Sequence, residues 1–306
     1  MFGFLDRLRN ISIAFNGIAL SLITLAQIYF MLSLNLLASL CQVLAIVIFV
    51  IKLLKYIFHR DILFNELDNY INGGYIPLFT MFIAALSTYV YKFNEVIGGI
   101  VWYIAFVTHL ALIFYLYYSH NQQKNLSLIL PNWFIPPIGF VAIGLAAKSI
   151  NANIIANWIF LFSDLVIIPL SITVIYRQIS KPLNSIEIYT TGIYAAPLSL
   201  LMLAMMKDTG LPFHEFQLMI LFYINILFNI FSCIGLLLCL RKKECIPCFA
   251  CFTFPFAVSA LANMKYAKIN PTALPIFYAI LSISSIMTIY TVAIIINQRV
   301  HQNSKS

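Results

Sequence analysis

Few residues of this 306-residue chain have the types and spacing that catalysis or metal binding requires. His214 and Glu215 are adjacent, but no second histidine follows at the spacing of a zinc-protease motif. Cys245, Cys248 and Cys251 have metal-ligand spacing and lack a fourth ligand. Glycine motifs for nucleotides and a nucleophile elbow are absent. We therefore expect no enzyme activity, no metal and no cofactor. The alternative is a membrane-embedded enzyme that uses His214 and Glu215.

A second group of side chains suits the passage of an ion. No acidic residue lies in the middle of the apolar segments that contain these side chains, so nothing there repels an anion. Hydroxyl dipoles and small residues can instead accommodate a weakly hydrated anion. The residues that we expect to line such a path are Ser21, Thr80, Gly139, Ser199, Thr253 and Ser259.

Three lysines could attract anions to this path. Lys148, Lys207 and Lys265 follow a helix-breaking proline by eleven, ten and ten residues. At a rise of 1.5 Å per residue, each lies about 15 Å from the break, where we expect the outer mouth. Positive charge there would concentrate anions. The alternative is that these are ordinary helix-end lysines whose ammonium groups reach the membrane interface.

The elements that position these residues repeat along the chain. Helix breakers recur at Gly17, Pro77, Pro137, Pro197 and Pro255, with separations of 60, 60, 60 and 58 residues. Proline removes a backbone hydrogen bond and bends a membrane helix, which is tolerated beside a cavity or a neighbouring helix. The repeat predicts five kinked inner helices, each followed by a bulkier helix that faces lipid.

The composition is that of an integral membrane protein. Hydrophobic residues make up 62% of the chain and charged residues 9%, and the mean hydropathy is +0.94. Ten segments reach the length of about 20 apolar residues that crosses a bilayer. We expect an all-α fold of ten transmembrane helices in a single domain, residues 1–306. The five predicted helical hairpins are residues 10–58, 70–118, 131–176, 188–240 and 249–297.

The basic residues predict the orientation. Thirteen of the eighteen Lys and Arg residues fall on the face that carries both predicted termini, and five fall on the other face. By the positive-inside rule, both termini are cytoplasmic. We expect the protein to lie in the cell's inner (cytoplasmic) membrane. The net charge of +8 therefore reflects topology. We expect lipid contact and no nucleic-acid partner.

The repeat also resembles a known family. WFIPPIGFVAIGLAA at 133–147, YAAPLSLLML at 194–203 and FTFPFAVSALA at 252–262 resemble the tellurite-resistance/dicarboxylate transporter family. This family belongs to the voltage-dependent anion channel superfamily, with the slow anion channels of plant guard cells. The resemblance covers nearly the whole chain. It implies quasi-fivefold symmetry of the hairpins, a central pore in each protomer lined by the kinked helices, and a homotrimer.

The resemblance further implies a phenylalanine that plugs the pore beside the proline of the ninth span. Phe254 matches this position, and Phe252 and Phe256 are the alternatives, since the register is open by two residues. The implied function is an anion channel or transporter for small inorganic or organic anions. The alternative is a proton-coupled carrier of C4-dicarboxylate, sulfite or tellurite-type oxyanions, which needs a titratable group such as His109 or Asp164 in the path.

Overall fold

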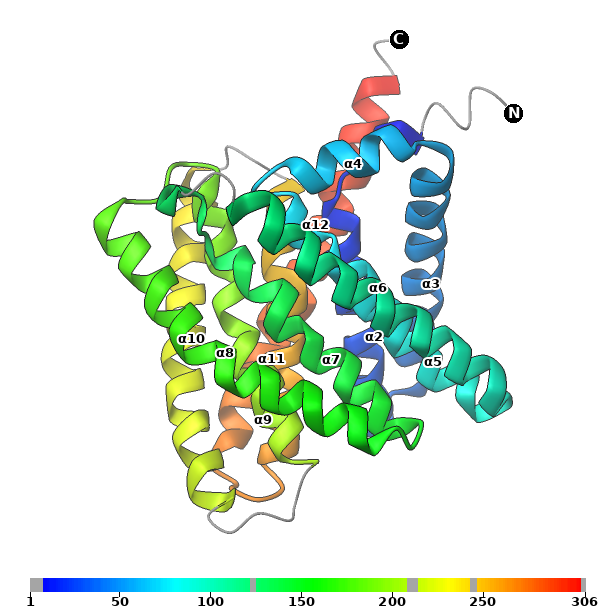
Figure 1. Ribbon diagram of the computed structural model, residues 1–306, viewed down its shortest axis with the longest axis vertical. Helices are drawn as coiled ribbons and strands as arrows, with labels where there is room; N and C mark the ends of the chain where they lie inside the picture. The colour runs from blue at the N-terminus through cyan, green and yellow to red at the C-terminus, as the bar shows by residue number, and fades with distance from the viewer. Residues whose placement is uncertain (1–7, 122–124, 208–213, 243–246, 304–306) are drawn as a thin grey trace. The chain divides into compact units, whose positions relative to one another are not determined.

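The computed structural model describes residues 8–121, 125–207, 214–242 and 247–303, and the elements in these ranges are all helical (Figure 1). Nine helices in the described ranges are long and apolar enough to cross a membrane. The remaining predicted span corresponds to α7 (Ile135–Ser149), a helix of 15 residues that continues from the 3₁₀ segment η3 (Pro131–Phe134). The all-α membrane fold is thus confirmed, and the fivefold hairpin symmetry stays a prediction.

The chain forms two compact units, each described here by itself. Unit 1 contains Met1–Lys55, Leu183–Ala196 and Asn229–Ser306, and unit 2 contains Tyr56–Pro182 and Pro197–Phe228. The single transmembrane domain expected from the sequence stays a prediction.

Unit 1 is organised around α11 (Thr253–Tyr266). Its other elements are α2 (Ala14–Met31), most of α3 (Asn35–Phe58), η4 (Glu187–Ala195), the second half of α10 (His214–Lys242), η5 (Pro247–Phe252) and α12 (Ala273–Asn303). The central helix α11 packs against α2, α12, η4 and η5. Residues of α11 are therefore held by neighbours on several sides.

Unit 2 is organised around α7. Its other elements are α4 (Arg60–Asp68), η1 (Gly73–Tyr75), α5 (Pro77–Phe93), α6 (Glu95–Asn121), η2 (Leu126–Leu128), η3, α8 (Asn153–Ser180), α9 (Pro197–Met205) and the first half of α10. The short helix α7 packs against α5, α6, α8 and α9. It is therefore surrounded by other helices of this unit, of which α5, α6 and α8 are longer than α7.

The helices fall into two classes by burial, in agreement with the predicted alternation of inner and outer spans. In α2 and in the spans that contain α5, α9 and α11, between 61% and 89% of residues are buried. In α3, α6, α8, α10 and α12 the buried share is only 22% to 39%. Large apolar side chains such as Leu36 (78% exposed) and Trp158 (68% exposed) project from the second class. These surfaces suit contact with lipid chains.

The prolines of the repeat lie where a 3₁₀ segment passes into an α-helix, and the kink predicted at each of them stays a prediction. Pro77 and Pro197 are the first residues of α5 and α9, Pro137 lies in the first turn of α7, and Pro255 is the third residue of α11. Each follows a 3₁₀ segment. First-turn N–H groups have no acceptor within their own helix, so proline loses no hydrogen bond there. An interior proline occurs instead in an outer helix, at Pro169 of α8.

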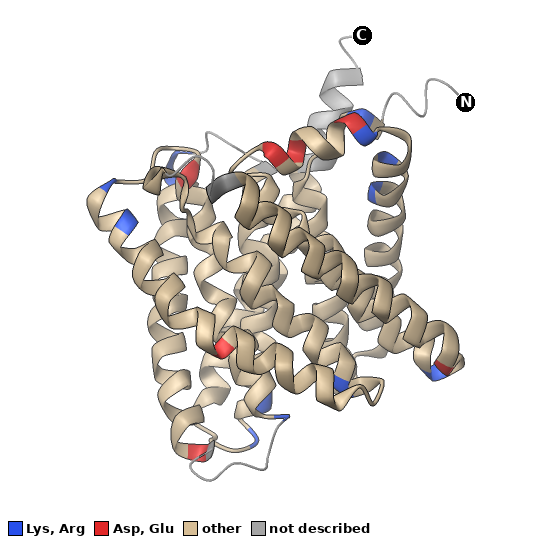
Figure 2. Ribbon diagram, viewed as in Figure 1, with Lys and Arg blue, Asp and Glu red and all other residues tan. Residues whose placement is uncertain are grey.

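Lys and Arg residues lie mainly near helix ends (Figure 2), and several of their side chains are buried. Lys52 and Lys55 are each 1% exposed, and Lys55 Nζ donates to the carbonyl oxygen of Ile11 at 2.7 Å. In unit 2, the guanidinium of Arg177 donates to the carbonyl oxygen of Ser127 at 2.8 and 3.1 Å. These cations bind backbone carbonyl groups, a structural role that a count of charges does not reveal.

Close helix packing in unit 2 depends on a glycine. A Cβ atom at Gly144 of α7 would lie 2.6 Å from Cε1 of Phe160 and 3.1 Å from Cγ2 of Ile159, both on α8. A Cβ atom at Gly99 of α6 would have no atom within 4 Å. The two glycines therefore provide a matched pair for testing how α7 packs on α8.

We expect Gly144→Ala to lower the free energy of unfolding by about 1–3 kcal/mol, because the Phe160 ring must move. Gly99→Ala is the control and should not destabilise, since alanine is favoured over glycine in a helix by about 0.8–1.0 kcal/mol. Thermal unfolding of the purified variants measures the difference. Equal melting temperatures would contradict this packing of α7 against α8.

Candidate functional site

Polar side chains of α11 bond to its neighbours in unit 1. Ser259 Oγ donates to Oδ1 of Asn229 on α10 at 2.9 Å. Asn263, one turn further on, donates from Nδ2 to the carbonyl oxygen of Ser259 at 2.8 Å. Ser284 of α12 donates to the carbonyl oxygen of Thr253 at 3.4 Å. The bonds to Asn229 and Ser284 fix the rotation of α11 about its axis, whereas the bond from Asn263 to Ser259 lies within the helix.

Phe252 and Phe256 lie on the side of α11 that carries Ser259. Their rings stack with centroids 6.3 Å apart and an interplanar angle of 20°, and both side chains are 0% exposed. Phe252 also packs against η4, where a Cβ atom at Gly192 would lie 2.8 Å from its ring. Both rings are therefore enclosed by the packing of unit 1.

Phe254 lies on the opposite side of α11. At about 100° per residue, it is about 200° around the helix from Phe256. Phe254 keeps 5% of its surface exposed, Val258 3% and Leu261 5%, and Lys265 at the end of the helix is partly exposed. The spacing i, i+4, i+7 and i+11 places these four residues on one stripe, which we call the Phe254 line. It is apolar except for its terminal lysine.

The helix α2 has a related arrangement. Ser21, four residues after Gly17, shares a hydrogen bond of 3.0 Å with Thr288 of α12. Asn16, immediately before Gly17, has the position relative to its breaker that Phe254 has in α11. Asn16 is 3% exposed, and among the described residues neither atom of its amide group has a hydrogen-bond partner.

The predicted lining residues of unit 2 are engaged within that unit. Thr80 Oγ1 lies 2.6 Å from Nδ1 of His109 on α6, and Ser199 Oγ donates to Oδ1 of Asn225 on α10 at 3.0 Å. Gly139 faces α5, where a methionine sulfur would lie 2.8 Å from an added Cβ atom. These residues join neighbouring helices.

All the hydroxyl groups that the sequence assigned to the path have partners in the structure. They are those of Ser21, Thr80, Ser199, Thr253 and Ser259. This differs from the expected polar lining, because the hydroxyls bond to neighbouring helices or to backbone carbonyl groups. On α11, the apolar side chains of Phe254, Val258 and Leu261 keep 3–5% of their surface exposed, while the Ser259 side chain is fully buried.

His109 connects the first turns of two inner helices. The side chain is fully buried, and Nε2 lies 2.9 Å from the carbonyl oxygen of Pro136 in α7. Its other nitrogen contacts Thr80, whose hydroxyl also donates to the carbonyl oxygen of Pro77 at 2.8 Å. The imidazole stacks on Phe140 with centroids 5.3 Å apart. His109 therefore serves the packing of α5, α6 and α7.

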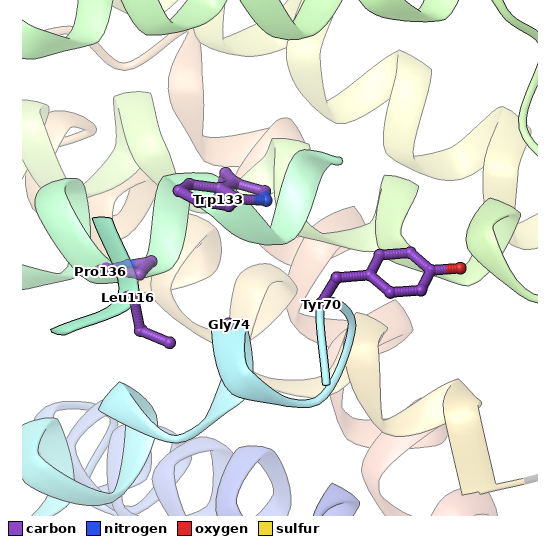
Figure 3. A pocket seen from close by; sticks show the side chains of 5 residues that line it. All are labelled: Tyr70, Gly74, Leu116, Trp133 and Pro136. Atoms are coloured by element: carbon purple, nitrogen blue, oxygen red, sulfur yellow. The ribbon is translucent and has the colours of Figure 1, made fainter. Parts of the chain in front are cut away.

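A small, partly open cleft lies beside this junction (Figure 3). It is lined by Tyr70, Gly74, Leu116, Trp133 and Pro136. In the close-up, Pro136 and Leu116 lie on one side of Gly74, Tyr70 projects to the other, and Trp133 lies above Gly74. None of these lining residues carries a charge, so the cleft has no side chain that would bind an ion strongly.

Lys148 and Lys207 lie together at one end of unit 2. Lys207 Nζ donates to Ser149 Oγ at 3.1 Å and lies 3.4 Å from the carbonyl oxygen of Leu145. Although the Lys207 side chain is exposed overall, desolvation of its ammonium group and then the charge of Lys148 lower its pKa below 10.5. Lys265 lies in unit 1, at the end of the Phe254 line. Two of the three predicted mouth lysines are thus neighbours.

The structure describes only some of the residues that the enzyme and carrier alternatives require. Glu215 is exposed in the first turn of α10, while the His214 side chain and Cys245 lie outside the described residues. Within the described ranges, no group of three His, Cys, Asp or Glu side chains could hold a metal ion. Asp164 is exposed on the outer helix α8.

Asn16 is the residue that the sequence reasoning missed. The residues before the other four breakers are Ile76, Pro136, Ala196 and Phe254, all of them apolar. An asparagine at the same point of the repeat is therefore a visible exception in the sequence. Its lack of hydrogen-bond partners, however, is visible only in the structure.

Comparison with known proteins agrees with this architecture. A family model described as voltage-dependent anion channel, SLAC1, matches residues 10–297. No curated protein shows significant similarity to the chain. The match includes all five breakers, both mouth lysines of unit 2 and the whole Phe254 line. The chain therefore belongs to the voltage-dependent anion channel family, whose members are membrane channels and transporters for anions.

Proposed function

We propose that the protein is an anion channel of the cytoplasmic membrane, with a path along the Phe254 line that the Phe254 ring closes. The Phe254 line itself carries this proposal. Its apolar side chains keep 3–5% of their surface exposed. The hydroxyl and amide side chains of α11 form hydrogen bonds on other sides of the helix. Phe252 and Phe256 are enclosed on the opposite side, which favours Phe254 as the plug.

The chemistry of the Phe254 line favours weakly hydrated anions. Val258 and Leu261 offer no ligand that replaces a tightly held hydration shell, and no carboxylate lies on the line. A bulky ring in such a narrow apolar passage blocks ions sterically and favours loss of water. Opening therefore requires a change in the Phe254 rotamer, and selectivity among small anions should be loose.

We also propose the predicted assembly and orientation: a central pore lined by the breaker-containing helices, cytoplasmic termini and a homotrimer. An exposed carboxyl group on an outer helix supports self-association. Asp164 lies in the middle of α8 beside Leu165, which is 68% exposed. A carboxyl group is costly against hydrocarbon, so a neighbouring protein copy is a better environment than lipid.

A proton-coupled carrier receives less support from the positions of the titratable groups. His109 is occupied by Thr80 and the carbonyl oxygen of Pro136 within unit 2, and Asp164 projects from an outer helix. Neither residue belongs to the Phe254 line. A passive path that needs no proton transfer accounts for these positions more simply.

Replacing Phe254 tests the plug. We expect Phe254→Ala and Phe254→Leu to raise chloride and nitrate currents in planar bilayers on the order of ten-fold or more, because the steric block is removed. The matched control is Phe256→Leu, which should leave the current at the wild-type level. These currents should persist without a pH gradient.

Two results would contradict this assignment. One is a current that rises with Phe256→Leu and not with either Phe254 variant, which would place Phe256 on the path. The other is an anion flux that requires a pH gradient, which would favour the proton-coupled carrier.

Lys207 should raise the local anion concentration while it is charged. In the Phe254→Ala background, we expect Lys207→Gln to lower conductance about three-fold at low salt. The effect should vanish near 1 M salt, where the screening length is only about 3 Å. A lysine with a lowered pKa loses its charge as the pH rises through a value below 10.5, so conductance should fall there in the parent and not in Lys207→Gln.

The control for this experiment is Lys92→Gln, which removes a helix-end lysine of α5. It should leave the conductance unchanged at every salt concentration. Equal effects of the Lys92 and Lys207 variants would mean that only the net charge of the protein matters.

A further inference from the structure

Asn16 differs from the other buried asparagines that have an unpaired atom. Both Oδ1 and Nδ2 of Asn16 lack a hydrogen-bond partner among the described residues, and the side chain is 3% exposed. In Asn132 and Asn263 only Oδ1 is unpaired, since Nδ2 of each donates to a backbone carbonyl group. A buried amide group that satisfies neither its donor nor its acceptor is costly in a protein interior. The unpaired donor and acceptor of the Asn16 amide group indicate that it binds a ligand.

The side chain of Asn16 is placed on the side of α2 that faces away from α12. Two residues mark the opposite side: Ser21 bonds to α12 through Thr288 at 3.0 Å, and Tyr29 through Ser285 at 2.7 Å. At about 100° per residue, Asn16 lies about 140° around the helix from both of them. The helix α2 packs against α11 and η5, the two elements that meet next to Phe254.

The chemistry of an amide group selects a particular kind of anion. Nδ2 donates hydrogen bonds and Oδ1 accepts them, side by side in one plane. An oxyanion that retains one proton offers the complement, an anionic oxygen next to an O–H group. A halide or a nitrate ion can use the donor but leaves Oδ1 facing negative charge. Bicarbonate, bisulfite and singly protonated dicarboxylates belong to the favoured class.

We propose that Asn16 is a recognition site for monoprotonated oxyanions on the anion path. Nδ2 donates to an anionic oxygen of the bound ion, and Oδ1 accepts the hydrogen bond from its O–H group. This inference rests on the proposed function, because the anion reaches α2 along the path that Phe254 closes. It adds a substrate class that the apolar Phe254 line alone does not specify.

Bicarbonate and nitrate provide a matched pair of probes, since both are planar, monovalent and carry three oxygens, and only bicarbonate has an O–H group. The experiment measures their permeability ratio from reversal potentials in the Phe254→Ala channel. We expect a preference for bicarbonate. Asn16→Leu, which has similar volume and no polar atoms, should reduce this preference by about five- to thirty-fold, as expected for the loss of paired hydrogen bonds.

Two further variants complete the test. Asn16→Ser is smaller and cannot present the planar donor–acceptor pair, so it should also reduce the preference and serves if the leucine variant does not fold. Ser21→Ala, on the side of α2 that bonds to α12, should retain the preference of the parent channel.

The outcomes separate this inference from the proposed function. An anion current in Phe254→Ala with the same permeability ratio in the Asn16 variants would overturn the role of Asn16 and leave the channel intact. The absence of any anion current in Phe254→Ala would overturn the proposed function and this inference with it.

Discussion

Backbone hydrogen bonding without water is the constraint on which this structure depends. Within a bilayer, every N–H and C=O group must find its partner inside the protein. Four inner helices, α5, α7, α9 and α11, meet this demand by starting anew behind 3₁₀ segments, with a proline in the first turn, where an N–H group would have no acceptor. His109 and Thr80 then bind carbonyl groups at two of these starts, those of Pro136 and Pro77. The junctions between these 3₁₀ segments and the helices that follow are therefore stable parts of the structure.

Because these polar groups form hydrogen bonds within the protein, they are not available to bind an ion. The hydroxyls of the inner helices are occupied in joining helices and in bonding to backbone carbonyls. The Phe254 line of α11 carries apolar side chains that are 3–5% exposed, and it ends at the partly exposed Lys265. Such a surface binds no ion tightly, which suits conduction. In this account Asn16, with its unpaired amide group, supplies the polar contact that the path otherwise lacks.

The sequence alone predicted the membrane fold, the positions of the breaks and the alternation of inner and outer helices. The apolar composition and the regular spacing of the helix breakers determine these features. It could not predict which way each side chain points. The rotation of α11 follows from contacts with Asn229 and Ser284, which are distant in sequence. The sequence could not predict the 3₁₀ segments before the prolines either, because a proline preceded by a 3₁₀ turn and one inside an α-helix look alike in a sequence. Burial of Lys55 against Ile11 likewise required the structure.

Removal of the Phe254 ring should leave the Phe254 line facing a water-filled path. The most direct measurement is the reaction of single cysteines with a negatively charged thiol reagent, in a Phe254→Ala channel whose native cysteines are replaced by serine. Leu261→Cys should react at a rate that nitrate slows by competition, while Ala260→Cys, fully buried in α11, should not react. Reaction at position 260 without reaction at position 261 would contradict the account.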